Sequence, residues 1–231
     1  VQYLFSQIYE PDRWSEAVAP GGLQKTLYTM FGSPFDFSYD PLIPDGLVSP
    51  SLQWPWDTSE RWYYTGGPHG GWDSGSAWAA VDFAPPRGEH GCAVSPRWVL
   101  AAAEGMIVHS DNGAVIQDLD GDGLEQTGWT ILYMHIDTGD RVKVGQYLAI
   151  GDKIGHPSCE GGYSNATHLH IARRYNGVWI SVDDTDLPLL IDGWKFTSSV
   201  REYDGWIEKG NIRLEAWDSQ GEINAIIARD D

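Results

Sequence analysis

From residue 61 onward the chain is a series of short apolar runs separated by glycine, and this pattern restricts the folds that it can adopt. The clearest runs are residues 98–102, 105–109, 114–116, 129–136 and 168–173. Each has the length of a strand and is rich in β-branched or aromatic residues, which is typical of an antiparallel sheet or sandwich. Residues 186–231 continue the pattern. We therefore expect a mainly β protein that ends in a C-terminal β extension.

The first 60 residues have a different character. Prolines recur at positions 11, 20, 34, 41, 44, 50 and 55. Because proline fixes φ and removes a backbone donor, this density interrupts regular elements. Only residues 22–30 predict a short helix. We expect residues 1–60 to form an arm that wraps on the domain that follows.

The charge of the chain limits its partners. The formal net charge is -18 at pH 7 over 231 residues. Phosphates would be repelled, which argues against nucleic acid and against simple electrostatic attachment to anionic membranes or acidic wall polymers. No apolar run approaches the roughly 18 residues that span a bilayer. We expect a monomer without a transmembrane segment.

Two cysteines, Cys92 and Cys159, are present. They do not have CxxC spacing, so they form either one disulfide or two buried thiols. The low lysine content and the many Trp, Tyr and Gly residues resemble secreted β-rich proteins, and we favour a disulfide and an extracytoplasmic setting. In the chain-entropy model such a bridge contributes roughly 4 kcal/mol.

Three of the polar residues that lie near or within apolar strands suggest a metal site. Asp82 lies inside the apolar run 80–84, where an unpaired charge is costly. His170 also lies on an apolar strand, and His69 follows a glycine-rich turn at residues 65–68. A Zn²⁺ accepts imidazole and carboxylate ligands, and a catalytic zinc has three protein ligands and an open position for water. The alternative for each histidine is a hydrogen-bonded core or surface residue, which we keep for His90, His109 and His156.

His135 and His168 offer two more imidazoles. His168 is two residues from His170, so both point to the same face of a strand. His135 ends the apolar run 129–136. Without binding a metal, such histidines can polarise water, accept its proton or stabilise an oxyanion.

These segments resemble the motifs of a known family. His69 to Asp82, Tyr133-Met134-His135 and His168-Leu169-His170 are similar to the motifs of the zinc endopeptidases related to lysostaphin, LytM and the β-lytic metalloendopeptidases. The long gap from His69 to Asp82 is closer to the β-lytic and staphylolytic branch. The similarity covers about residues 62–180.

The resemblance implies His69, Asp82 and His170 as zinc ligands and His135 and His168 as catalytic histidines. It implies a LytM-like antiparallel β-sheet groove with the metal on its floor, and a zinc peptidase core at residues 61–185. It also implies hydrolysis of peptide bonds in peptidoglycan cross-bridges, often next to glycine. The N-terminal arm has no motif that aligns, and the acidic charge is unusual for a wall-degrading enzyme.

A second metal is suggested by residues 118–124. Asp118, Asp120 and Asp122 stand at positions 1, 3 and 5 of a calcium loop, with the sharp-turn glycine, Gly123, at position 6 and the Leu124 carbonyl as the next ligand. Position 12 is Trp129, so the bidentate glutamate of a complete loop is missing. The alternative is an acidic, solvated hairpin turn.

Aromatic residues also surround the first metal motif. They either line a substrate groove or pack in the core and rim: Trp62, Tyr63, Tyr64, Trp72 and Trp78.

We therefore expect a secreted or cell-envelope zinc endopeptidase. Two rivals belong to other classes: a catalytically inactive peptidoglycan-binding or amidase-activating module, and a calcium-dependent extracellular structural domain. The first usually lacks one or more of the five functional positions, and this chain has all five.

Overall fold

The computed structural model describes residues 23–33, 40–86 and 91–226. Residues 1–44 and 45–231 form two compact units. In the first unit the predicted helix is confirmed as α3, which spans Leu23–Phe31. The rest of the predicted arm before residue 23 and at 34–39 lies outside the described residues, as does His90.

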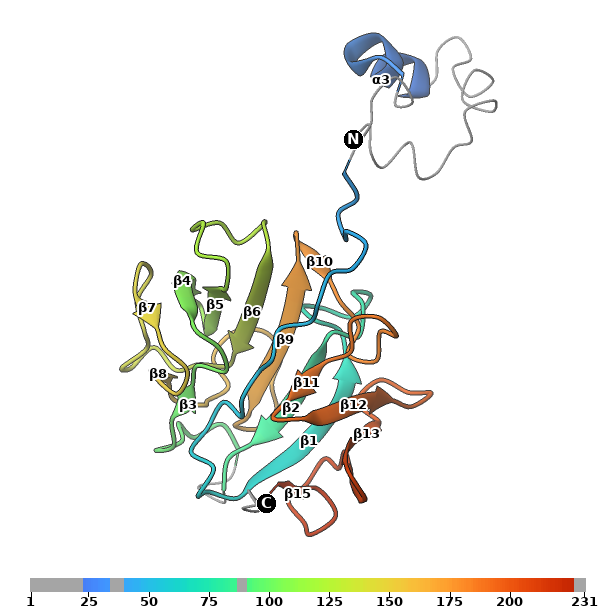
Figure 1. Ribbon diagram of the computed structural model, residues 1–231. Coiled ribbons are helices and arrows are strands. Elements are labelled where there is room, and N and C mark those ends of the chain that lie inside the picture. The colour runs from blue at the N-terminus through green and yellow to red at the C-terminus, as the bar shows by residue number, and fades with distance from the viewer. Residues whose placement is uncertain (1–22, 34–39, 87–90, 227–231) are drawn as a thin grey trace. The chain divides into compact units, whose positions relative to one another are not determined.

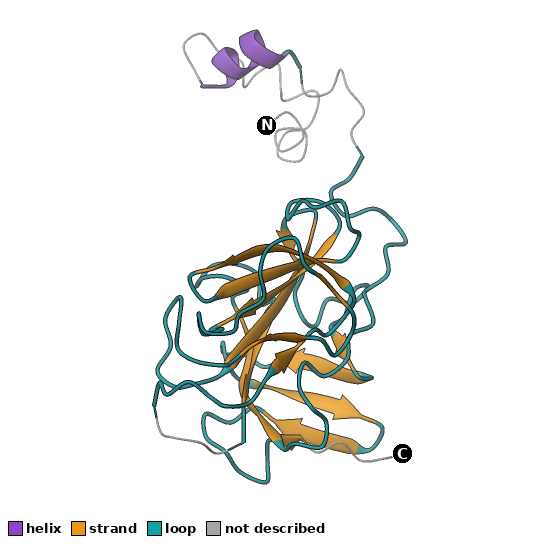
Figure 2. Ribbon diagram, turned by 90° about the vertical axis from the view of Figure 1, so that its left-hand side faces the viewer, coloured by secondary structure: helices purple, strands orange, loops and turns teal. Residues whose placement is uncertain are grey.

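The second unit consists of strands and loops, and Figure 2 shows no helix among its described residues. The mainly antiparallel β fold predicted from the apolar runs is confirmed. The strands are β1 (Trp62–His69), β2 (Ala80–Ala84), β3 (Val99–Leu100), β4 (Gly105–Asp111), β5 (Ala114–Asp118), β6 (Trp129–Met134), β7 (Tyr147–Leu148), β8 (Lys153–Gly155), β9 (Leu169–Tyr175), β10 (Val178–Trp179), β11 (Leu190–Ile191), β12 (Trp194–Ser198), β13 (Gly205–Lys209), β14 (Ile212–Glu215) and β15 (Ala225–Ile226).

One large sheet organises this unit. Its strand order is β15-β1-β2-β9-β6-β5-β4-β7, and β10 pairs with β9 at one end. Figure 1 shows β6, β9, β2 and β1 side by side at its centre. Two smaller sheets, β11-β12-β13-β14 and β3-β8, complete the fold. Strands far apart in sequence are therefore neighbours at the centre of this unit.

The two faces of the large sheet differ. One face packs on the main core, to which β2 contributes Val81 and Phe83 and β12 contributes Phe196. Alternate residues point to the opposite face, where the buried apolar cluster is smaller and includes Ala80, Leu132 and Met134. Asp82 and His170 alternate with the main-core residues, so they lie on this second face.

The segment from Asp45 to β1 runs along the sheet as extended chain (Figure 1). Its side chains Leu52, Trp54 and Trp56 are buried in the main core. Trp56 stacks on Trp62 with ring centroids 4.7 Å apart. Residues 45–60 of the predicted arm thus supply core to this unit. Among the described residues, no helix is both long and apolar enough to cross a bilayer.

Candidate metal centre

The register of three strands brings the predicted zinc ligands together. Asp82 on β2 is directly opposite His170 on β9. His69 ends β1, and two irregularities between Tyr64 and His69 bring this strand over Asp82. As a result, ligand atoms of His69, Asp82 and His170 all lie within 4.8 Å of one another.

The three ligand atoms converge closely. His69 Nε2 is 2.9 Å from His170 Nδ1, and Asp82 Oδ1 is 3.3 Å from the first nitrogen and 3.2 Å from the second. Ligands on a tetrahedral zinc about 2.0–2.1 Å away have a similar spacing. All three residues are buried.

In each histidine ring, the nitrogen that does not face Asp82 forms a hydrogen bond that fixes the tautomer. His69 Nδ1 is 2.8 Å from the Gly67 carbonyl, and His170 Nε2 is 3.1 Å from the Gly71 carbonyl. A carbonyl only accepts, so these nitrogens carry the protons, and in the neutral rings the two nitrogens that face Asp82 are lone pairs. Backbone carbonyls commonly orient zinc-binding histidines in this way.

This arrangement leaves three acceptors facing one another. Asp82 Oδ1 is a buried oxygen without a hydrogen-bond partner in the described structure. Two lone pairs and a carboxylate oxygen at this spacing repel each other unless a cation lies between them. Imidazole, imidazole and carboxylate form a donor set that suits zinc, and the residues fit the ion.

The pKa shifts of Asp82 and His69 also indicate that positive charge is favoured at this centre. Burial opposes ionisation of Asp82, but the neighbouring imidazoles of His69, His168 and His170 hold its pKa well below the usual range. Burial lowers the pKa of His69, but the Asp82 carboxylate outweighs burial and raises it.

His135 and His168 lie beside this centre. Their rings are 4.3 Å apart between centroids, and His168 Nε2 is 3.7 Å from Asp82 Oδ1. His168 immediately precedes β9, where it forms an isolated bridge with Ser158. The sequence interpretation placed it on the strand itself.

His135 follows β6 with a left-handed φ of 66°. Regular strand geometry alternates side chains, but here the left-handed residue ends the strand, and His135 lines the same groove as Met134. Such a conformation is costly for a residue other than glycine and persists where surrounding contacts hold it. The apolar run alone gave no signal of this turn.

A groove of about 1660 Å³ contains the centre. Trp72 and Tyr203 line it and are about half exposed. The Tyr203 ring stacks on His69 with centroids 4.2 Å apart. Tyr203 and its neighbour Glu202, which accepts from the Gly70 amide, were not identified from the sequence because they lie on the distant β12–β13 connection.

Of the five aromatic residues considered for the groove, only Trp72 lines it. Trp62 and Tyr64 are fully buried in the main core, because the register of β1 points both toward it. Tyr63 and Trp78 are half-buried and lie outside the lining.

The second predicted metal loop also forms a cluster. Carboxylate oxygens of Asp118, Asp120 and Asp122 lie within 4.8 Å of one another. Asp118 is buried and accepts hydrogen bonds from the amides of residues 120, 121 and 123, while the Leu124 amide donates to Asp122. The loop's own backbone thus provides partners for these oxygens.

The predicted disulfide is confirmed between Cys92 and Cys159, whose Cα atoms are 5.2 Å apart. His156 Nδ1 donates to the Arg97 carbonyl, 2.8 Å away, and His156 lies outside the groove lining. His109 on β4 is also outside that lining.

Comparison with known proteins identifies a family. Residues 76–182 match the model of peptidase family M23. Over 179 residues the chain is 26% identical to protease LasA of Pseudomonas aeruginosa, covering 70% of this chain and 40% of LasA. The chain thus spans about 40% of the length of the curated relative that it matches.

The solved structure of one metalloprotease supports the fold. The M23 metalloprotease pseudoalterin, from the deep sea, superposes with a TM-score of 0.59 at 23% identity, covering 73% of this chain and 96% of pseudoalterin. The catalytic domain of lysostaphin from Staphylococcus simulans is 27% identical, covers 54% of this chain and 90% of its own, and has a TM-score of 0.35.

Proposed function

Because residues 76–182 of this chain are a domain of peptidase family M23, we propose that the protein is a zinc-dependent endopeptidase. One observation carries the proposal. His69, Asp82 and His170 converge with two lone pairs and an unpartnered buried carboxylate oxygen, and two further histidines lie beside them.

When bound, zinc supplies Lewis-acid polarisation of a peptide carbonyl and activates water near neutral pH. His69, Asp82 and His170 are the residues that would hold it. Their neutral tautomers and the depressed pKa of Asp82 keep all three ready to coordinate.

His135 and His168 are proposed to move protons. His135 Nδ1 is 3.2 Å from the Glu160 carbonyl and His168 Nδ1 is 2.8 Å from the Ala166 carbonyl. Both rings therefore carry the proton on Nδ1, which leaves Nε2 free to accept one. After accepting it, either imidazolium can donate to an oxyanion or to the leaving amine.

We propose peptides of peptidoglycan cross-bridges, containing glycine, as the substrate class, on the resemblance of the five site positions to the lysostaphin and β-lytic enzymes. The setting is secreted or cell-envelope, which the disulfide supports because such bonds persist in oxidising compartments. We expect the enzyme to act as a monomer.

Digestion of purified peptidoglycan and of pentaglycine, with and without a zinc chelator, tests this function. We expect cleavage products by mass spectrometry, their loss on chelation and their return on adding zinc. If the chain binds peptidoglycan equally before and after chelation and releases no product, the inactive binding module is the better description.

A structural calcium ion at Asp118, Asp120, Asp122 and the Leu124 carbonyl remains a separate proposal. Calorimetric titration with Ca²⁺ of the native chain and of an Asp120→Asn variant tests it. Absence of a heat of binding in the native chain would leave the loop as an acidic turn stabilised by its own amides.

A further inference from the structure

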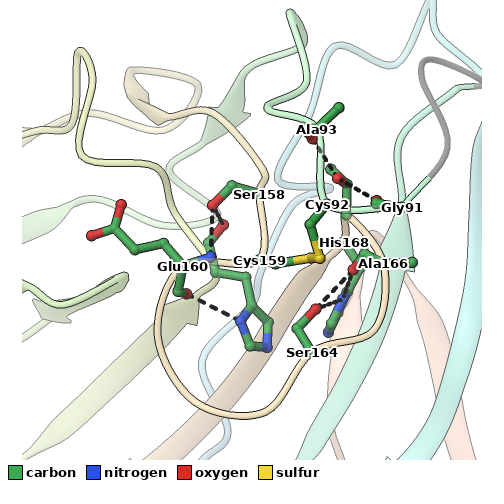
Figure 3. Close-up of a disulfide and its surroundings, with 11 residues drawn as sticks. Gly91, Cys92, Ala93, Ser158, Cys159, Glu160, Ser164, Ala166 and His168 are labelled. Carbon is green, nitrogen blue, oxygen red and sulfur yellow. Dashed lines mark hydrogen bonds between the residues drawn. A yellow bond between two sulfur atoms is a disulfide. The ribbon is translucent and has the colours of Figure 1, made fainter.

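We infer that the Cys92–Cys159 disulfide and Ser158 are positioning elements that fix the two catalytic histidines relative to each other. The inference rests on the proposed function for the roles of His135 and His168. Its basis is that each end of the disulfide belongs to a segment that holds one of these histidines (Figure 3).

At the Cys159 end, Ser158 and Glu160 hold His135. The Ser158 amide and hydroxyl both donate to the His135 carbonyl, at 2.7 and 3.0 Å. The same hydroxyl accepts from the Glu160 amide at 2.9 Å, and the Glu160 carbonyl accepts from His135 Nδ1 at 3.2 Å. Ser158 Oγ therefore links the backbone of His135 to the residue that sets its tautomer.

At the Cys92 end, residues on both sides of the cysteine hold the chain next to His168. Gly91 O accepts from the Thr167 amide at 2.9 Å, and Gly91 O and Ala93 O both accept from the Thr167 hydroxyl. Thr167 immediately precedes His168. Ser158 adds a direct link, because it forms a β-bridge with His168. The disulfide thus fastens the support of one histidine to the support of the other.

Further contacts hold the turn at residues 158–161, which contains Cys159. The Glu160 carboxylate accepts from Thr138 at 2.7 Å and from Arg141 at 2.8 Å, and Arg141 donates to the Ile136 carbonyl as well. Gly161, at φ +75°, lies so close to the Asn112 carbonyl that a Cβ would overlap it. The turn therefore has a fixed place against the β4–β5 connection.

The spacing matters because both imidazoles must reach one reacting centre. Their centroids are 4.3 Å apart, and each presents Nε2 only while its Nδ1 hydrogen bond persists. A shift of about 1 Å in a catalytic group can cost about 10²-fold in rate. Loosening the turn should therefore reduce catalysis while leaving the ligands on β1, β2 and β9 in place.

Removing the disulfide tests this directly, since the chain has only two cysteines. We compare the zinc-loaded native enzyme, the same enzyme reduced with a phosphine, and a Cys92→Ala/Cys159→Ala variant. We expect kcat to fall about 10- to 100-fold, with KM, zinc stoichiometry and the near-ultraviolet circular dichroism spectrum retained. An unchanged kcat, or a loss of kcat only together with zinc or fold, overturns the inference.

Ser158→Ala tests the same positioning role and leaves the disulfide intact. It removes the hydroxyl between His135 and Glu160, and we expect a similar fall in kcat. Ser110→Ala is the matched control, because Ser110 also donates to a backbone carbonyl, that of Val142, but lies outside the groove lining. An equal effect in both variants would refute a specific role for Ser158.

The tautomer of His135 gives a readout that does not depend on activity. Long-range ¹H–¹⁵N spectra of the zinc-loaded enzyme, assigned with His135→Gln, should show the Nδ1–H form in the native protein. Reduction or Ser158→Ala should produce exchange between tautomers, and an unchanged spectrum contradicts the inference. If the native protein hydrolyses no peptide, the proposed function fails, whereas the spectrum still decides whether this turn holds His135.

Discussion

At the residue scale, His168 and His170 are held by opposite nitrogens although they are two positions apart. His170 directs Nδ1 toward Asp82 and bonds Gly71 through Nε2, whereas His168 bonds Ala166 through Nδ1 and leaves Nε2 free.

We predict that His170→Ala loses zinc and activity together. His168→Ala should retain about one zinc per chain while kcat falls about 10²- to 10⁴-fold. Metal analysis beside steady-state kinetics separates the two, and an active His168→Ala enzyme would refute its role.

We expect the pH dependence of kcat/KM to follow from the pKa of His135. Burial, reinforced by the nearby His168 and His170, lowers the pKa of His135 to about 4 from 6.5. The ring thus stays neutral, and able to accept a proton, as the pH falls through 6.5, and it becomes protonated only nearer 4. We predict that kcat/KM declines on the acid side with an apparent pKa between these values.

Zinc content must be measured at every pH of that profile, because protonation of ligands also releases metal. A decline centred at 6.5 or above with zinc fully bound would show that a group other than His135 sets the acid side.

At the scale of elements, the close approach of β1 to β2 places Asp82. A Cβ on Gly66 would lie 2.5 Å from Asp82 Oδ2 and 2.9 Å from its Cβ, so a side chain there must displace the carboxylate. We predict that Gly66→Ala weakens zinc binding by about 10- to 100-fold, the range seen when metal ligands lose their orientation. Competition with a chromogenic chelator measures it.

Gly221→Ala is the control for this substitution. Its Cβ would make only an ordinary contact, 3.9 Å from Ile223. Equal zinc affinity for Gly66→Ala and the native chain would mean that β1 shifts to accommodate the new methyl group without displacing Asp82.

The elements also show how far sequence reasoning reaches. The apolar runs predicted the central strands, because strand length and β-branched composition are local properties. Asp82 and His170 were predicted to bind the same metal, because each is a polar residue in an apolar strand. The contact of His170 with the Gly71 carbonyl, the left-handed turn at His135 and the stacking of Tyr203 on His69 were not predicted. Each depends on contacts between distant segments, which no local pattern contains.

At the scale of the whole molecule, the negative charge extends into the groove. Besides Asp82, the described lining residues include Asp73, Glu202 and Asp218, and none of them is Lys or Arg. With a net charge of -18, the field at the groove should attract cationic peptides and repel acidic ones. The substrate preference is thus expected to depend on charge as well as on glycine content.

We predict that a glycine peptide flanked by lysine has a higher kcat/KM than its glutamate counterpart, by about tenfold at 0.01 M salt, where the Debye length is about 30 Å. The ratio should fall toward unity at 1 M salt, where that length is about 3 Å. A glutamine-flanked peptide controls for general salt effects. Asp218→Asn, an exposed lining residue, should reduce the ratio without changing zinc content. A preference for the glutamate peptide, or a ratio that salt does not change, would mean that the bound metal outweighs these carboxylates and that local contacts select the substrate.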